Sequence, residues 1–521
     1  MPRLDDGTES IHKNYCVHES VGIAVGFLLA ALHAAGFAKL TQSVTSSSAR
    51  GHLFDGALRL FVAEALLPLS GLVTSAVLTR RLGVAGYGRF ALAATLVGTI
   101  QWVLTALLAR ATIRIVGESK DWQPAASAAL RLYLFGGFAA GLALAVLASP
   151  LARLFGEAPL AQELRLFALD MPLFGLVQAH VNVLLGRGRF RERARARALR
   201  WTVRLALIVA FVEAGFSVTG AILGSLGASL AELIVARALV QPSLGAGQAP
   251  PLGRLWSYAM PLFLSGIGLR VMGVDLVALK ALGASAMDAG FYGAALSLSM
   301  LPNLLALSVA PALLATLVRL RAEGRESEAR VLTRDAARGV LLLAPFAAIG
   351  LGARVEVVRF VFGGAFAASA PLLVPLVLAS LSILTVALMT AALTAVGRLR
   401  LTATLTLPMP LVAVAGYAFV VPRAGIEGAA WVTATVAVSG CLASLVAVAR
   451  ILGARPELAT LARIAGVCAS GWIASSLIPG AGVWILPKLG VLFLGCAATL
   501  LALGELPRER RGLWAALRSA A

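Results

Sequence analysis

Arg270 is the residue whose type and position most clearly suggest chemistry. It lies near the middle of an apolar stretch, residues 256–279, between Gly268 and Gly273. Charged residues inside such stretches are rare and usually face a cavity or a partner charge. An arginine can also donate paired hydrogen bonds to a phosphate group. Arg270 is therefore a candidate cation for anion binding, or one half of a structural ion pair.

Four further positions suggest ion coupling or gating. Asp275 follows Arg270 by five residues, about 140° around an α-helix, so the two do not share a face. A buried carboxylate can carry a proton or bind sodium, or it can be a hydrogen-bonded packing group. Glu64 lies four residues before Pro68, and a proline can kink a helix, which fits either a gating helix or a static bend. Asp170 is the fourth candidate.

Amides and arginines in other apolar stretches could contact a polar substrate. Gln178 and Asn182 are four residues apart and share a helix face. These two and Gln101 could bind hydroxyl groups, or they could hold neighbouring helices together. Arg200 and Arg204 could receive a phosphate, although extension toward lipid headgroups is the favoured interpretation.

The composition is that of a membrane protein. Of the 521 residues, 59% are hydrophobic and 13% are charged, and the mean hydropathy is +0.88. A soluble fold could not hide this much apolar surface from water. The net charge of +20 lies in short arginine clusters between apolar stretches, which favours cytoplasmic loop charge over nucleic-acid binding. The four cysteines form no CxxC pair, and no Walker-type phosphate loop is present, so neither a metal site nor ATP hydrolysis is expected.

Apolar stretches of about 20 residues can cross a bilayer core of about 30 Å. We therefore expect an all-α integral membrane protein with about 14 transmembrane helices. The stretches are residues 57–79, 87–109, 126–149, 164–186, 198–216, 218–240, 256–279, 291–318, 336–353, 370–396, 399–421, 427–450, 461–479 and 483–504.

Loop charges set the expected orientation. Arginine clusters within 187–204 and 319–338 and in the tail fall on one side of the membrane. Positive charge accumulates on the cytoplasmic side, so both ends of the core are expected there. Arg80, Arg81 and Arg89 are exceptions, because they fall in an outward loop.

The sequence predicts six parts along the chain. They are an N-terminal extension at 1–54 that could hold an extra or interfacial helix, a six-helix bundle at 55–240, a link at 241–255, a second six-helix bundle at 256–450, two peripheral helices at 451–505 and a basic tail at 506–521.

A weak internal repeat links two of the loops. The first copy contains Leu82, Gly83, Gly86, Tyr87 and Gly88, and the second contains Leu282, Gly283, Gly290, Tyr292 and Gly293. The copies are 200 residues apart at the first glycine (83 to 283) and 205 apart at the tyrosine (87 to 292), so the second loop holds five more residues. Duplicated halves around a site at the membrane midplane are a transporter architecture.

These loops carry a family resemblance. The segment 78–92, with Arg80 and Arg81 at its start, resembles the first-loop signature of bacterial polysaccharide-biosynthesis transporters, the O-antigen-type oligosaccharide flippases. Residues 258–262, Asp275 and the second copy of the repeat fit the same family. It is similar to multidrug and toxic compound extrusion transporters and to lipid II flippases, within one exporter superfamily. The resemblance covers residues 55–505.

The resemblance implies two six-helix bundles in a V around a central cavity, plus two peripheral C-terminal helices. It implies a non-enzymatic flippase of the bacterial inner membrane that moves an isoprenoid-pyrophosphate-linked oligosaccharide outward for lipopolysaccharide, capsule or exopolysaccharide synthesis. Membrane lipids and polymerase machinery are the implied partners. No cofactor is implied, and proton or sodium coupling stays open. The alternatives are a cation-coupled small-molecule antiporter of the same superfamily and a membrane polysaccharide polymerase.

Overall fold

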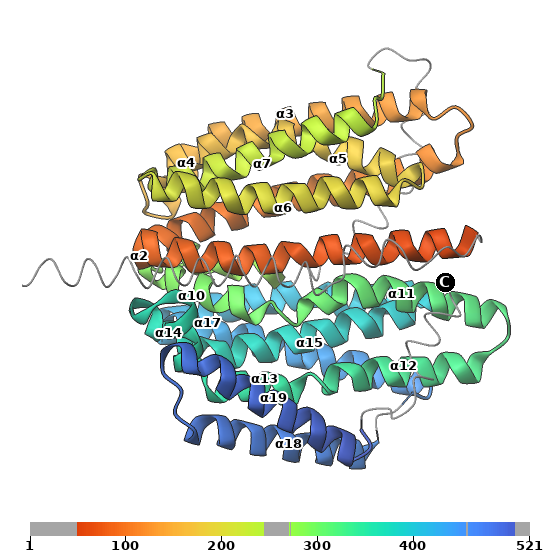
Figure 1. The fold of residues 1–521 in the computed structure, drawn as a ribbon, viewed down its shortest axis with the longest axis vertical. Helices are drawn as coiled ribbons and strands as arrows, with labels where there is room; N and C mark the ends of the chain where they lie inside the picture. The colour runs from red at the N-terminus through yellow and green to blue at the C-terminus, as the bar shows by residue number, and fades with distance from the viewer. Residues whose placement is uncertain (1–48, 244–269, 271, 455–456, 506–521) are drawn as a thin grey trace, which may run out of the picture. The chain divides into compact units, whose positions relative to one another are not determined.

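The computed structural model describes residues 49–243, 270, 272–454 and 457–505, with the side chains of all of these except 49–69, 272 and 303–308. Within these ranges the chain is almost entirely helical and contains no β-strand (Figure 1). Residues 59–520 form one compact unit, to which every contact below belongs. Most of the expected N-terminal extension, the link and the basic tail lie outside the described residues.

The first group of helices precedes residue 240. Within it, α6 packs on α7, and α3 and α7 both pack on α5 (Figure 1). Its members are α2 (Ala49–Glu118), α3 (Gln123–Leu154), α4 (Leu160–Ala168), α5 (Asp170–Gly186), α6 (Phe190–Glu213) and α7 (Ser217–Leu239).

The second group follows residue 270 and centres on α15, which contacts α10, α11 and α17. The last two long helices, α18 and α19, pack on α13 (Figure 1). The elements are η1 (Met272–Val274), α9 (Asp275–Ala281), α10 (Ala286–Ser299), α11 (Asn303–Ala322), α12 (Glu326–Leu341), α13 (Ala344–Gly352), α14 (Arg354–Phe362), η2 (Gly364–Ser369), α15 (Ala370–Ala395), α16 (Leu399–Thr406), α17 (Pro408–Ile451), α18 (Leu458–Leu477), η3 (Gly482–Trp484) and α19 (Ile485–Ala502).

Nine stretches of the described residues are long and apolar enough to cross a membrane. Two of them, residues 70–118 and 399–451, are 49 and 53 residues long, about twice what one crossing needs. Residues 399–451 hold two predicted spans, and residues 70–118 hold the span at 87–109 and the end of the span at 57–79. The predicted span at 198–216 is α6, and the one at 256–279 lies largely outside the described residues. The all-helical membrane fold expected from hydropathy is thus confirmed.

At two places where the sequence predicts a loop between spans, the direction of the chain instead reverses at one glycine residue. Gly83 in α2 and Gly425 in α17 have φ values of 67° and 55°, a left-handed conformation that glycine adopts without steric cost. The chain turns back there while the residues on both sides stay helical. In contrast, the predicted span at 291–318 is divided, because Met300, Leu301 and Pro302 separate α10 from α11. Proline lacks the backbone N–H that a continuous helix requires.

The repeated glycines bring α2 and α10 into close contact. A methyl group added at Gly290 would overlap the backbone carbonyl of Val84, and one added at Gly88 would overlap that of Ala286. At the same contact, the Tyr87 hydroxyl lies 3.0 Å from the Ser297 hydroxyl. The repeat therefore packs its two copies against each other.

Replacing Gly290 with alanine is expected to destabilise the protein by about 1–3 kcal/mol, because overpacking forces the two backbones apart. Thermal unfolding of the purified protein measures the change. Gly339→Ala in α12 is the control, since a Cβ there meets open space, and alanine is the better helix former by about 0.5–1 kcal/mol. Equal unfolding temperatures for the two variants would contradict this packing.

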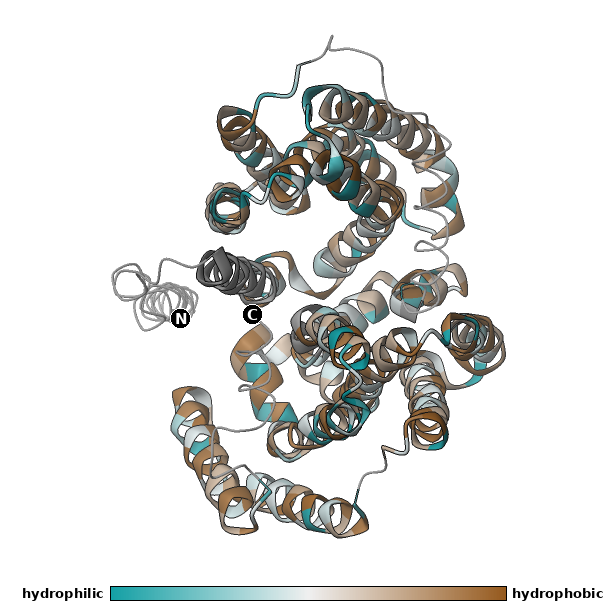
Figure 2. Ribbon diagram, turned by 90° about the vertical axis from the view of Figure 1, so that its right-hand side faces the viewer, coloured by the Kyte–Doolittle hydropathy of each residue, from teal (hydrophilic) through white to brown (hydrophobic). Residues whose placement is uncertain are grey.

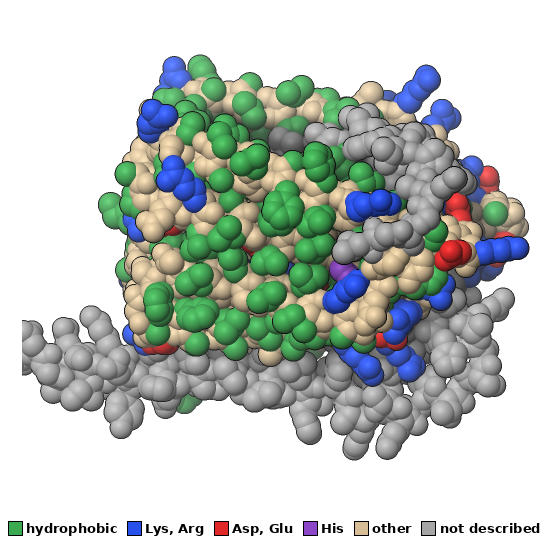
Figure 3. Space-filling view, turned by 90° about the horizontal axis from the view of Figure 1, so that it is seen from above, with side chains coloured by type: hydrophobic (Ala, Val, Ile, Leu, Met, Phe, Trp, Pro, Cys, Tyr) green, Lys and Arg blue, Asp and Glu red, His purple; other side chains and the backbone are tan. Residues whose placement is uncertain are grey.

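The outer surface of the described helices is apolar over most of its extent. Hydrophobic residues lie on the outward faces of the helices in both groups (Figure 2). Phe135, Leu411 and Leu494 are 76%, 74% and 74% exposed. The space-filling view shows hydrophobic side chains across the middle of one face and Lys and Arg toward its ends (Figure 3). Exposed apolar area of this extent requires lipid rather than water as its solvent.

Candidate functional site

Arg270 is beside α2. Its Nη2 atom lies 3.8 Å from the position that a Cβ on Gly98 would occupy, and its Nη1 atom lies 3.6 Å from that of Gly273. Its Nε atom is buried and has no hydrogen-bond partner. Among the described residues it forms neither a hydrogen bond nor an ion pair. Asp275, the nearest acid in the sequence, is bound elsewhere. The guanidinium group is therefore available to an anion between the two groups of helices.

A buried carboxylate lies in the first group of helices. Asp170 begins α5, is 2% exposed and accepts a 2.9 Å hydrogen bond from Nε2 of Gln101 in α2. It is within electrostatic reach of Arg200 and Arg204 in α6. The structure thus brings together four of the polar residues that the sequence suggested.

Arg200 and Arg204 do not extend to lipid headgroups. Arg200 is 7% exposed and donates a 2.9 Å hydrogen bond to Glu232 of α7, which also lies 3.4 Å from Arg197. Arg204 lies 3.4 Å from the Ser225 hydroxyl. The favoured interpretation of Arg200 as a snorkelling residue was wrong. The physical reason is Glu232, whose carboxylate gives the guanidinium a charged partner inside the protein.

Replacing Glu232 with glutamine is expected to cost about 3–5 kcal/mol of stability, because two buried arginines lose their counter-charge. The effect is measured as a decrease in the unfolding temperature of the purified protein. Circular dichroism during heating, or size-exclusion chromatography after heating, gives that temperature. Glu118→Gln is the matched control: Glu118 pairs with Arg114 at an exposed site, where an ion pair is worth about 0–1 kcal/mol. An unfolding temperature for Glu232→Gln as high as that of the control would contradict a stabilising role.

The two amides of α5 lie in packed contacts. Asn182 is 3% exposed and donates a 2.9 Å hydrogen bond to the Tyr133 hydroxyl of α3. Gln178 is also 3% exposed, and its Oε1 lies 3.4 Å from Arg197. Both side chains therefore hold helices of the first group together and do not face open space. Glu64 and Pro68 fall within residues 49–69, the first part of α2, whose side chains are not described.

A second buried carboxylate lies in the other group of helices. Asp275 begins α9, is 2% exposed and accepts a 2.9 Å hydrogen bond from the Tyr292 hydroxyl of α10. The chain of hydroxyls continues through Thr433 to Tyr417, both in α17. No cluster of three or more potential metal ligands occurs in the described part of the chain. This network can hold a proton or coordinate a small cation, and Asp275 forms no ion pair with any described residue.

The two copies of the repeat share this arrangement. Tyr87 donates to Ser75, twelve residues before it, and Tyr292 donates to Asp275, seventeen residues before it. The five-residue difference equals the longer second loop. Gly83 and Gly283 both have left-handed φ values, 67° and 91°. The equivalent position thus carries a serine in the first half and an aspartate in the second.

Contacts at the loop end of the repeat join the two groups of helices. Lys280 of α9 forms a 2.9 Å ion pair with Glu157, which lies between α3 and α4, and its side chain is 2% exposed. Arg80 of α2 donates to the backbone carbonyl of Phe360 in α14. Arg81, in contrast, pairs with Glu213 at the end of α6, within the first group, at 2.6 Å. Arg80 and Arg81, two of the three exceptions to the charge rule, therefore each have a partner at this end.

A family model described as "polysaccharide biosynthesis protein" matches residues 77–371, more than half of the chain. The chain belongs to this polysaccharide biosynthesis protein family. The match begins just before the first copy of the repeat and ends at the start of α15, so it contains Arg270, Asp170 and Asp275.

Solved structures share the fold of this family member. The lipid II flippase MurJ in an inward closed conformation superimposes with a TM-score of 0.72 and 12% identity, covering 86% of this chain and 98% of that one. The MATE transporter VcmN of Vibrio cholerae gives a TM-score of 0.56 and 17% identity, covering 79% and 98%. At these identities the likeness shows the fold alone: a multi-pass membrane protein with the architecture of flippases and MATE transporters.

A short match to a curated protein adds nothing about the site. Forty residues are 62% identical to an iodotyrosine deiodinase of Haliscomenobacter hydrossis, which is 8% of this chain and 17% of that protein. The chain therefore spans about a sixth of the length of that relative.

Three contacts of the candidate site were not predicted from the sequence. Glu232 stands out as an acid inside the apolar stretch 218–240, which was a sufficient signal for a buried partner. Lys280 directly follows the predicted span at 256–279, and its partner Glu157 is 123 residues away, so no local pattern relates the two. Thr433 and Tyr417 have no sequence signal, because hydroxyl residues are common in membrane helices.

Proposed function

We propose that this protein moves an isoprenoid-pyrophosphate-linked oligosaccharide across the bacterial inner membrane for surface polysaccharide synthesis. The observation that carries the proposal is Arg270, a guanidinium group in a predicted membrane span with no counter-charge among the described residues. A fixed cation at this depth is costly unless an anion binds there at some stage. A pyrophosphate is such an anion, and arginine binds phosphate oxygens in pairs.

The family supports a polysaccharide precursor as cargo, and the fold supports a flippase mechanism. Arg270 would bind the pyrophosphate. Gln101 and Asp170, which are hydrogen-bonded to each other, would lie on the side of the first group, with Arg204 behind them. The glycan would follow the pyrophosphate through the same polar path, while the isoprenoid chain stays in lipid. Polymerase machinery would receive the product in the outer leaflet.

Movement between the leaflets requires that the two groups of helices separate alternately at each end. The contacts of Lys280 with Glu157 and of Arg80 with Phe360 would close the outward end while the cytoplasmic end admits cargo. Asp275 would supply coupling to a proton or to sodium, because its carboxylate is buried beside hydroxyl groups that reach α17. We propose no bound cofactor.

Deletion of the gene in its host tests the proposal. The expected result is loss of a surface glycan together with accumulation of a polyprenyl-pyrophosphate oligosaccharide on the cytoplasmic side, detected by mass spectrometry of extracted lipids. Re-expression of the wild-type chain restores the glycan. An unchanged surface glycan with no lipid-linked intermediate would favour the small-molecule antiporter, which the MATE-like fold also permits.

A further inference from the structure

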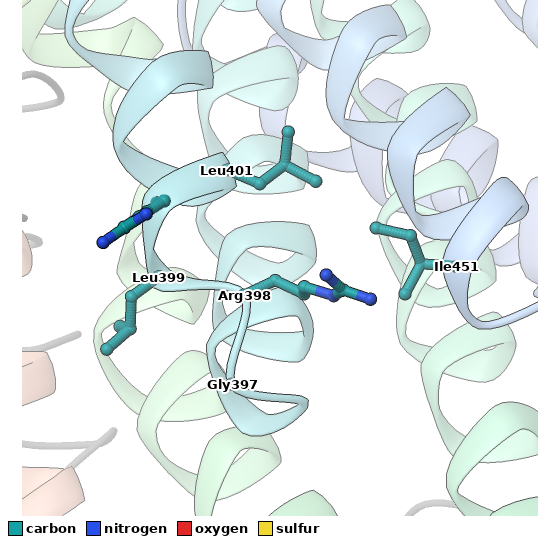
Figure 4. A pocket seen from close by; sticks show the side chains of 6 residues that line it. Gly397, Arg398, Leu399, Leu401 and Ile451 are labelled. Carbon is teal, nitrogen blue, oxygen red and sulfur yellow. The ribbon is translucent and has the colours of Figure 1, made fainter.

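A pocket of about 740 Å³ opens at the turn between α15 and α16. It is lined by Gly397, Arg398, Leu399, Arg400 and Leu401 on one side and by Ile451, near the end of α17, on the other. The Arg398 side chain reaches from the turn toward Ile451 (Figure 4). Gly397 has a φ value of 77°, a left-handed conformation that ends the helical stretch of α15, and Arg398 and Arg400, which follow it, both line the pocket.

The positive charge of this pocket has no acidic partner among the residues that the structure describes. Neither Arg398 nor Arg400 forms a side-chain hydrogen bond or ion pair within the described part of the chain, and both are exposed. Residues 357–426 contain no aspartate or glutamate at all.

Other arginines at this end of the second group have acids beside them. Arg334 pairs with Glu457, and Arg338 and Arg463 pair with Glu505. Hydrogen bonds from Arg463, Arg338 and Thr460 outweigh the effect of burial and lower the pKa of Glu505, which keeps its carboxylate charged. Arg398 and Arg400 therefore differ from these three arginines, each of which has an acid beside it.

The pocket combines this charge with apolar walls. Leu399 is 59% exposed and Ile451 is 39% exposed. The turn follows one candidate membrane span, residues 364–395, and precedes another, residues 399–451. It therefore lies at the level where the hydrocarbon of a bilayer meets its headgroups, on the side that the arginine-rich loops predict to be cytoplasmic.

We infer that this pocket binds an anionic phospholipid, with Arg398 and Arg400 on the headgroup phosphate and Leu401 and Ile451 against the first part of an acyl chain. Basic pockets between membrane helices on the cytoplasmic side bind anionic headgroups. A free phosphate would satisfy the arginines but would leave the apolar walls uncovered. The inference does not depend on the identity of the transported cargo.

Native mass spectrometry of the full-length protein in detergent tests the inference. Phosphatidylglycerol and phosphatidylcholine are titrated separately onto the wild type, onto Arg398→Gln/Arg400→Gln and onto the control Arg450→Gln. Arg450 precedes Ile451 and is exposed, but it does not line the pocket. We expect the double variant to bind phosphatidylglycerol about tenfold more weakly, a change of about 1.4 kcal/mol. The control is expected to match the wild type, and phosphatidylcholine binding should be the same for all three proteins.

Two results would overturn the inference. One is equal phosphatidylglycerol binding by the double variant and by Arg450→Gln. The other is displacement of phosphatidylglycerol by inorganic phosphate at equal concentration, which would make the pocket a phosphate site without lipid recognition. Thermal unfolding of the three proteins verifies that the substitutions, all at exposed positions, leave the fold intact.

Discussion

Replacing Arg270 with alanine is expected to stop glycan export while the protein still reaches the membrane. A charged hydrogen-bonding partner of a phosphate contributes about 3 kcal/mol at most, so the rate of transport should fall about a hundredfold. The measurement is the amount of surface glycan and of polyprenyl-pyrophosphate oligosaccharide in a deletion strain that expresses the variant. The lipid-linked intermediate should accumulate as it does in the deletion strain.

Two further variants separate charge from geometry and from general damage. Arg270→Lys keeps the positive charge but cannot donate the paired hydrogen bonds of a guanidinium group, so it should restore transport only in part. Arg423→Ala removes an arginine whose one partner among the described residues is Phe419, which supplies a backbone carbonyl and an aromatic ring. This variant should transport normally. If Arg270→Ala exported glycan at the wild-type rate, Arg270 would not be part of the binding site. The deletion strain could still confirm the cargo, so the two proposals are tested separately.

Much of the fold could be predicted because hydropathy and helix length are local properties. The long apolar stretches gave the membrane helices, and the glycines of the repeat marked both reversals and close contacts. The structure adds that the same five-residue difference relates Tyr87 and Ser75 to Tyr292 and Asp275. Ser75 was not singled out from the sequence, because its hydroxyl gives no signal before the hydrogen bonds are known.

The partners of the charged residues could not be predicted in the same way. Arg200 and Arg204 have the same apparent position near the end of a span, yet Arg200 binds Glu232 and Arg204 lies beside Ser225. The choice depends on the rotation of α6 against α7, which no local pattern fixes. The contacts of Gln178 and Asn182 could not be predicted either. Their shared helix face could have pointed to a cavity, but both side chains are buried against neighbouring residues.

A covalent bridge between residues 157 and 280 is expected to arrest transport. Lys280 and Glu157 belong to different groups of helices and form an ion pair at the end that the loop charges predict to face outward. If cargo leaves through that end, the two residues must separate in each cycle. We propose Glu157→Cys and Lys280→Cys in a chain whose native cysteines are replaced by serine, joined by a bis-methanethiosulfonate reagent about as long as the ion pair. Glycan export should stop on treatment and recover when a reductant cleaves the bridge.

The residues Arg81 and Glu213 provide the matched control. They form an ion pair at the same end of the molecule, but both belong to the first group of helices. A bridge between Arg81→Cys and Glu213→Cys therefore adds the same reagent and the same loss of charge without joining the two groups. Export should continue in this variant. Full export with residues 157 and 280 bridged would show that this end stays closed throughout the cycle, and arrest by both bridges would show that the groups are not the moving units.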